Sequence, residues 1–295
     1  MYICKKDMVN LEEVAKNIRK IVSDRQKVLG LTFEEDTHTY TMKDSKGNLS
    51  STWPSVSKIL KIFYTPFPAE EIAERKSKGD LEYKEKLLKE WSDAGSYATN
   101  LGSRVHFILE KNTLDMFNID KEVREPIFDC DFTQILKGDS MINGGNKFLK
   151  IMEERGAVLL DTEMVLGDPE LGYTGQPDKM WLIYNPELKK IGLIISDWKT
   201  NKPKNFESTY WTKDMLHPFS DLPDNALGHY YCQLPFYCKL LLKMLEGSEY
   251  EDISVFGGIV VLVKDSGDFE EFRVPKKTQR EILNMDMSKY LTKLK

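Results

Sequence analysis

The sequence predicts an α/β fold in which helices flank a mixed central β-sheet and a helical N-terminal portion packs over the cleft. The main observation is a strand–turn–strand pattern, in which Asn185 and Pro186 separate the apolar runs Lys179–Tyr184 and Ile191–Ile195. Long helical patterns surround it along the chain, the strongest over Asn225–Leu245. A chain of 295 residues with 41% hydrophobic residues is also long enough for one large domain.

The N-terminal portion, residues 1–95, is expected to pack on a core of residues 96–295, so that the two make one compact unit. It begins with an amphipathic helix over Leu11–Leu29. Alternation over Phe33–Met42 predicts a strand, and the turn sequence Lys46-Gly47-Asn48 connects it to a second strand over Leu49–Trp53. Ser55 is a good N-cap for the helix that follows.

Two further helices precede the strand–turn–strand pattern. Ala69–Trp91 carries many charges of both signs, which is typical of a solvated helix, and Gly79 interrupts it. Asp93–Glu110 then places His106 and Glu110, which are four residues apart, on one helix face. A lone histidine on a helix is more often structural. A functional role for His106 therefore depends on the other charged residues described below.

The other predicted elements follow the same periodicities. In order, they are helices and turns over Asn112–Asn146 with a break at Gly144 and Gly145, a helix over Lys147–Arg155, a strand over Ala157–Leu166 that carries Glu163, strands over Val255–Val263 and Phe269–Val274, and a closing helix over Lys276–Leu294. Within the helix Asn225–Leu245, Pro235 is expected to introduce a kink.

Three charged residues stand at the ends of the hairpin strands. Asp178 precedes the first strand, Asp197 ends the second, and Lys199 follows two residues later. Antiparallel pairing brings Asp178 and Asp197 to the same end of the hairpin, and alternation puts Asp197 and Lys199 on one face. Carboxylates this close repel unless a hard cation lies between them, and Mg²⁺ prefers few carboxylates and open water positions. A divalent ion beside a lysine suits phosphodiester hydrolysis.

Other triplets of this kind have a simpler explanation in a chain that is 30% charged. Asp44-Ser45-Lys46 and Glu187-Leu188-Lys189 lie at turn-like positions, and Glu82-Tyr83-Lys84 lies in a helical charge run. Solvation explains these three. It does not explain three charged groups at the ends of apolar strands.

The arrangement resembles the PD-(D/E)xK nuclease superfamily, specifically its RecB-like exonuclease branch. The residues that carry the resemblance are Gly175-x-x-Asp178 with Asp197-x-Lys199-Thr200, the helix motif Gly102-x-x-x-His106-x-x-x-Glu110 upstream, and Gln233-x-x-x-Tyr237 downstream. They occur in the family's order and cover about Leu101 to Leu245. Trp53–Leu60 is also similar to a segment of phage-type and mitochondrial-genome-maintenance-type exonucleases.

The resemblance implies a restriction-endonuclease-like PD-(D/E)xK fold and an Mg²⁺- or Mn²⁺-dependent deoxyribonuclease. His106, Asp178, Asp197 and the backbone carbonyl of Trp198 would bind the metal, and Lys199 would position or deprotonate the attacking water. Glu110 and Glu163 are candidates for a supporting role. The candidate DNA contacts are Gln233, Tyr237, Ser55, Lys202 and Lys204. For Ser55 the alternative is a simple helix cap, and for the two lysines it is a solvated loop.

The implied reaction is exonucleolytic cleavage of DNA that is single-stranded or has a free end, in recombination, repair or replication. The style of the motifs is phage or bacterial, so the expected location is the cytoplasm of a bacterial or phage-infected cell, with a recombination or replication protein as a candidate partner. Two alternatives stay open. One is a structure-specific or CRISPR-adaptation-like endonuclease of the same superfamily, and the other is a non-catalytic nucleic-acid-binding protein on a nuclease scaffold.

Composition adds several expectations. The net charge of −5 argues mildly against a nucleic-acid partner, although Lys199, Lys202, Lys204 and Lys213 cluster after the hairpin. No apolar run approaches the roughly 20 residues that span a bilayer, and residues 1–7 lack the apolar core of a signal peptide. Some relatives bind an iron–sulfur cluster through cysteines near the C-terminus, but no cysteine follows Cys238, so no cluster is expected.

The loop Asn201–Asp224 leaves two interpretations open. It is long, and it interleaves aromatic residues with lysines. The aromatic rings either pack the loop against itself or stack on unpaired bases.

Overall fold

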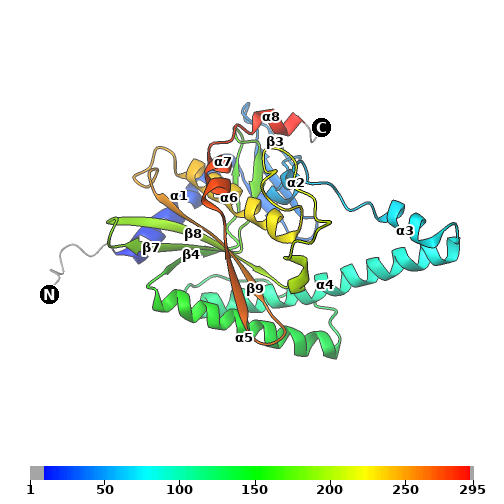
Figure 1. Cartoon of the computed structure of the whole chain (residues 1–295). Coiled ribbons are helices and arrows are strands. Elements are labelled where there is room, and N and C mark those ends of the chain that lie inside the picture. Colours follow the sequence, from blue (N-terminus) through cyan, green and yellow to red (C-terminus); the bar gives the residue numbers. More distant parts are fainter. Residues whose placement is uncertain (1–9, 293–295) are drawn as a thin grey trace.

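A five-stranded mixed sheet lies at the centre of the computed structural model, which describes residues 10–292 (Figure 1). The strand order is β10-β9-β8-β7-β4, and every neighbouring pair is antiparallel except β8 and β9. The strands are β4 (Val158–Thr162), β7 (Lys179–Asn185), β8 (Lys190–Lys199), β9 (Ser254–Val263) and β10 (Phe269–Arg273). Parallel neighbours need a crossover connection, and here it contains helix α6 (Ala226–Leu245).

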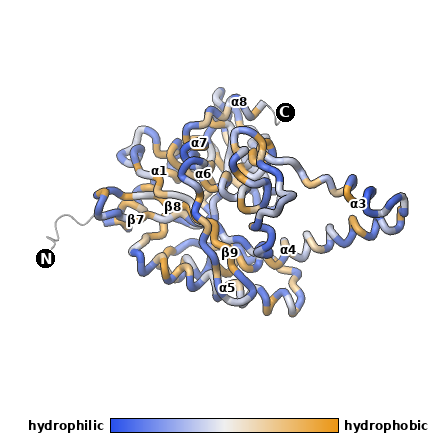
Figure 2. Tube along the Cα trace, in the orientation of Figure 1, coloured by the Kyte–Doolittle hydropathy of each residue, from blue (hydrophilic) through white to orange (hydrophobic). Residues whose placement is uncertain are grey.

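Helices cover both faces of this sheet. Helices α4 (Leu81–Met116) and α5 (Phe132–Glu154) pack on one face, where Trp181 and Trp198 are fully buried. Helices α1 (Leu11–Leu29) and α6 pack on the other, over a second buried cluster. Because side chains alternate along a strand, neighbouring residues of the sheet serve opposite cores. Figure 2 shows the long hydrophobic stretch of β9 between these helical layers.

Smaller elements surround the central sheet. Two small antiparallel sheets are present, one made of β1, β2 and β3 and the other of β5 and β6. The remaining elements are β1 (Thr32–Glu34), β2 (Thr39–Lys43), β3 (Leu49–Ser50), α2 (Val56–Leu60), α3 (Ala69–Ser77), β5 (Leu166–Asp168), β6 (Tyr173–Gly175), the 3-10 helix η1 (Pro203–Asn205), α7 (Lys276–Leu283) and α8 (Ser288–Leu291).

The hairpin at the centre of the sequence pattern is confirmed. β7 and β8 pair antiparallel, with Lys179 opposite Ser196, and β8 continues to Lys199. The strand over 255–263 and its partner over 269–274 are confirmed as β9 and β10. Helices α1 and α6 have the predicted bounds within a residue, and α6 runs unbroken through Pro235.

Two predicted strands are wrong, because each is interrupted by a residue whose backbone is in the left-handed conformation. The alternation over Phe33–Met42 belongs to two antiparallel strands, β1 and β2, joined by a turn in which His38 has a φ of 50°. The strand over Ala157–Leu166 ends at Thr162, and Glu163 follows with a φ of 44°. A non-glycine residue in this region marks a turn, so β5 leaves the central sheet.

The helical region between residues 69 and 155 also differs from the prediction. Its break near Gly79 is confirmed, where Lys78 and Gly79 both have positive φ, but α4 then runs continuously through Asp93 to Met116. Residue 95, the expected domain boundary, therefore lies inside a helix. In addition, α1 shares a core with α6, so residues on both sides of that boundary pack together.

The predicted break at Gly144 and Gly145 is wrong, since both lie inside α5. A Cβ atom on Gly144 would lie 2.4 Å from the backbone oxygen of Asp268, and one on Gly145 would lie 2.5 Å from a methyl group of Leu109. The two glycines thus let α5 approach the β9–β10 turn and α4, and are not helix breakers here. The closing helix is likewise two short helices, α7 and α8.

Some expectations concern residues outside the described range of 10–292, namely Cys4, the start of the chain at residues 1–7 and the last residues of the predicted closing helix. Among residues 10–292, no helix combines the length and the apolar character needed to cross a lipid bilayer.

Candidate metal centre

The charged ends of the hairpin converge as the strand register requires. Asp178 precedes β7, and because Lys179 pairs with Ser196, Asp178 comes next to Asp197. Asp197 and Lys199 share the face of β8 that α6 covers, where Lys199 Nζ lies 4.3 Å from the ring centre of Tyr230. The predicted convergence of two carboxylates and one ammonium group is therefore present in the structure.

Asp178 is held by groups from two other elements. Its Oδ2 atom accepts a hydrogen bond from the backbone N–H of Trp198 over 2.8 Å, and His106 Nδ1 lies 3.1 Å from the same oxygen. Burial alone would raise the pKa of Asp178, but its interactions with His106, Lys179 and Lys199 together outweigh burial and hold this pKa well below its usual value. Asp178 is therefore the ionised carboxylate of the site.

His106 reaches Asp178 because α4 passes close to the end of β8. One turn earlier on the helix, a Cβ atom on Gly102 would lie 3.2 Å from Thr200 Oγ1, so glycine keeps the helix near the loop after the strand. The histidine side chain is 30% exposed, which leaves it open to the cavity beside it. The helix motif thus positions an imidazole at the strand ends.

Glu163 completes a group of three ligand atoms. One atom each from His106, Glu163 and Asp178 lies within 4.8 Å of the other two. The left-handed turn at Glu163 brings it here, and its backbone N–H donates to the carbonyl of Asp178 while its carbonyl accepts from Gln176 Nε2. Glu163, which sequence reasoning assigned only a supporting role, is therefore a full member of this group.

Two carboxyl groups of the centre, those of Glu163 and Asp197, have raised pKa values. Burial, followed by repulsion from Asp178, raises the pKa of Glu163 well above its usual value. The same two causes raise the pKa of Asp197 to about 7, although Lys199 opposes them. These carboxylates are thus costly to ionise together in the absence of a cation.

Lys199 forms an ion pair with Asp197, with 2.5 Å between Nζ and Oδ2. Burial by itself would lower the pKa of Lys199, but the Asp197 carboxylate and Tyr230 outweigh it and raise the pKa above its ordinary value. Lys199 is therefore a cation over the whole physiological range. Asp197 Oδ2 is also a buried atom that has no hydrogen bond of good geometry, although it is in this ion pair.

This donor set fits a small divalent cation. Neighbouring ligand atoms of an octahedral Mg²⁺ site are about 3 Å apart, since its bonds are about 2.1 Å long. The 3.1 Å between His106 Nδ1 and Asp178 Oδ2 matches that spacing. Asp197 stands outside the three-residue group but interacts electrostatically with Asp178 and Glu163. An imidazole with several carboxylates also admits Mn²⁺, and the geometry does not select one metal.

The other predicted residues lie at different distances from this centre. Glu110 accepts a hydrogen bond from Thr162 Oγ1 over 2.9 Å, which fits an orienting role. Gln233 Nε2 donates to the hydroxyl of Tyr237, and Tyr237 is 5% exposed, so a nucleic acid could be contacted by Gln233 but hardly by Tyr237. Ser55 caps α2 by accepting from the backbone N–H of Lys58.

Lys202 and Lys204 are exposed on the loop after β8, beside a cavity of about 750 Å³. Trp198 contributes its N–H to Asp178, while its carbonyl stays a predicted ligand. Cys232 and Cys238 are buried in α6, and Cys130 lies before α5.

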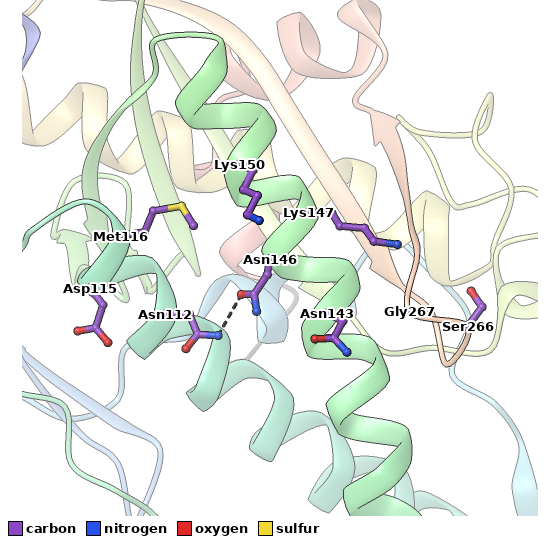
Figure 3. A pocket seen from close by; sticks show the side chains of 9 residues that line it. All are labelled: Asn112, Asp115, Met116, Asn143, Asn146, Lys147, Lys150, Ser266 and Gly267. Atoms are coloured by element: carbon purple, nitrogen blue, oxygen red, sulfur yellow. Dashed lines mark hydrogen bonds between the residues drawn. The ribbon is translucent and has the colours of Figure 1, made fainter.

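The candidate metal centre opens into a cavity of about 900 Å³. His106, Glu110, Glu163 and Gln176 line one side of it. The β1–β2 turn and residues 121–127 line the other, so the part of residues 1–95 that borders this cavity is the β1–β2 hairpin and not a helix. A different pocket, drawn in Figure 3, lies between α4, α5 and the β9–β10 turn, and its hydrogen bond between Asn112 and Asn146 joins the two helices away from the carboxylates.

Sequence reasoning missed Lys179, which is 1% exposed and places Nζ 4.4 Å from the ring centre of Trp198. Burial lowers the pKa of this lysine, while the carboxylates of the centre oppose the shift. Its position directly after Asp178, at the start of an apolar run, was the available signal. Tyr230, beneath Lys199, had no signal beyond its place on the α6 pattern.

No protein-family model matches the chain, and no curated protein matches it.

Proposed function

We propose that the chain is a metal-dependent nuclease that hydrolyses phosphodiester bonds in DNA, and that it acts as an exonuclease. The observation that carries the proposal is the convergence of His106, Glu163 and Asp178 within 4.8 Å, beside the Asp197–Lys199 ion pair and at the wall of a large cavity. Perturbed ionisable groups gathered at a cavity are typical of active sites.

The fold is consistent with the more specific proposal of a PD-(D/E)xK architecture. The sheet is mixed, helices cover both faces, and the charged residues lie at the ends of the central strands. The three motifs lie on α4, on the β7–β8 hairpin and on α6, in the order of the RecB-like branch. That order supports exonuclease activity over the other members of the superfamily.

Each side chain has a role in this proposal. His106, Asp178, Glu163 and Asp197 would hold Mg²⁺ or Mn²⁺, with the carbonyl of Trp198 as a further predicted ligand. When bound, the cation would polarise the phosphoryl group and lower the pKa of a water molecule. Lys199 stays protonated, so it offsets the negative charge that develops on the phosphoryl oxygens and does not act as a base. Gln233 offers its amide to the strand.

Digestion of end-labelled DNA tests the proposal. Linear single- and double-stranded substrates are incubated with Mg²⁺, Mn²⁺ or EDTA, and the Asp178→Asn variant serves as the inactive control. The expected result is loss of the label with either metal and none with EDTA. Equal cleavage by the variant, or no cleavage with any metal, would contradict the proposal.

A covalently closed circular substrate separates the remaining alternatives. An exonuclease leaves it intact while it degrades the linear form, whereas an endonuclease of the same superfamily cuts both. DNA binding without cleavage under every metal condition would support a non-catalytic binding protein.

A further inference from the structure

The long loop of residues 201–224 divides its aromatic side chains into two groups. Phe206 and Phe219 are buried, 7% and 0% exposed, and pack against rings of the core. Tyr210 and Trp211 are 92% and 84% exposed. The first group explains how the loop is fixed to the protein. The second contributes almost no burial to folding and needs another explanation.

The two exposed rings are presented by a well-anchored turn. The backbone N–H of Thr209 donates to Thr212 Oγ1 over 2.8 Å, and the N–H of Thr212 donates to the carbonyl of Thr209. Before the turn, the side chain of Asn225 donates to the carbonyls of Phe206 and Glu207.

After the turn, the N–H of Asp224 donates to the carbonyl of Lys213 over 2.7 Å. Both ends of residues 209–212 are therefore tied to the start of α6. A fixed turn presents aromatic faces to a ligand at a lower entropic cost than a free loop does.

The rings of Tyr210 and Trp211 meet edge to face, with centroids 5.1 Å apart and planes at 86°. In this arrangement they leave ring faces uncovered by each other. Trp181 and Trp198 show the contrast, since the chain buries these two completely. An exposed tryptophan next to an exposed tyrosine is the composition of a stacking surface for flat, apolar groups.

The surroundings of the turn indicate the chemistry of the ligand. The same loop leaves the candidate metal centre directly after Lys199, and Phe206 contacts the ring of Tyr230, on which Lys199 lies. Lys202 and Lys204 before the turn and Lys213 after it are exposed. Glu207 and Asp214 are exposed on the same segment, so residues 202–214 carry three ammonium groups and two carboxylates. The ammonium groups lie before and after the two aromatic rings along the chain, as phosphates lie before and after each base of a single strand.

We infer that Tyr210 and Trp211 form a stacking site for unpaired bases of the strand whose phosphates contact Lys202 and Lys204. This inference rests on the proposed nuclease function and deepens it, because it assigns single-stranded DNA, or the unpaired end of a duplex, as the preferred substrate. Inside a duplex the bases are stacked on one another, so their faces are not free for the two rings.

Binding in EDTA tests the inference without cleavage. The probes are a fluorescein-labelled oligothymidylate and an oligomer of equal length that has the sugar–phosphate backbone but no bases, and the readout is fluorescence anisotropy. The full-length protein should bind the oligomer with bases more tightly. The double variant Tyr210→Ala/Trp211→Ala should lose affinity for it by roughly fivefold or more and bind the baseless oligomer unchanged.

Two further variants make the result specific. Trp211→Phe keeps a stacking face and should retain most of the preference. Phe132→Ala removes another exposed aromatic residue, 74% exposed at the start of α5, and it should change nothing. Since neither Tyr210 nor Trp211 is buried, these variants should keep the wild-type melting temperature.

The outcomes separate this inference from the nuclease proposal. Unchanged affinity of the double variant for both oligomers overturns the stacking site, even if the protein cleaves DNA normally. A change in oligomeric state without a change in DNA affinity also overturns it and assigns the rings to a protein contact. A wild-type protein that binds neither oligomer and cleaves nothing contradicts the proposed function itself.

Discussion

His106 Nδ1 lies 3.1 Å from Asp178 Oδ2, and this contact joins helix α4 to the residue directly before strand β7. It places an imidazole beside a carboxylate that is already fixed by the N–H of Trp198. The pair therefore defines the position at which a cation would bind, and the residues around it give separate tests of metal binding, catalysis, charge and packing.

Metal binding should depend on Glu163. The Glu163→Gln variant is expected to bind Mn²⁺ roughly tenfold more weakly or worse, because it removes a charged ligand atom from the group of three. In EDTA the same variant should have a higher melting temperature, because glutamine removes the cost of burying a carboxyl group that Asp178 also repels. Calorimetric titration with MnCl₂ and thermal unfolding measure the two effects. Glu187→Gln, at an exposed turn, is the control, and equal Mn²⁺ affinity of both variants would remove Glu163 from the site.

Catalysis should depend on the charge of Lys199. Lys199→Ala is expected to lower the cleavage rate by about a hundredfold or more while DNA binding in EDTA changes little, since the ammonium group acts on charge that develops during the reaction. Single-turnover cleavage and anisotropy measure the two quantities. Lys189→Ala, on the turn between β7 and β8, should cleave like the wild type. If Lys199→Ala also cleaves normally, Lys199 has no catalytic role.

Asp197 should make the metal-free protein less stable as the pH rises. Its folded-state pKa of about 7 lies above the unfolded value near 4, so the folded protein binds an extra proton between these values and loses stability as pH increases through that window. The loss should be a few kcal/mol at most.

Asparagine mimics the protonated form of Asp197. In EDTA, Asp197→Asn should therefore raise the melting temperature at pH 8 and change it little at pH 5. An effect of equal size at the two pH values would show that Asp197 is ionised at both. Mn²⁺ affinity of the wild type should rise over the same window, because protons compete with the cation.

Packing between α4 and α5 should depend on Gly145. Gly145→Ala is expected to destabilise the protein by roughly 1–3 kcal/mol, because the new methyl group would lie 2.5 Å from Leu109. Gly95→Ala, inside α4 and facing open space, should instead stabilise it by up to about 1 kcal/mol. Urea denaturation of both variants provides the measurement, and a neutral effect of Gly145→Ala would show that the two helices separate easily.

The sequence by itself determined the parts of the fold that depend on local periodicity. Two apolar runs separated by the turn at Asn185-Pro186 predicted the β7–β8 hairpin, and the antiparallel pairing of such a hairpin brings Asp178 and Asp197 to the same end. The helical pattern of α6 was equally clear. These predictions succeeded because the pattern that identifies a strand or a helix is present in consecutive residues of the sequence.

Only the tertiary structure decided which distant residues meet. Periodicity places His106 on a helix face but does not specify the strand end that it contacts, and it cannot show that a left-handed turn carries Glu163 into the same group. Likewise, Gly145 resembled a helix break until its contact with Leu109 was known. A sequence pattern encodes which side chains turn away from solvent, whereas the partner that each one meets follows from how whole layers pack.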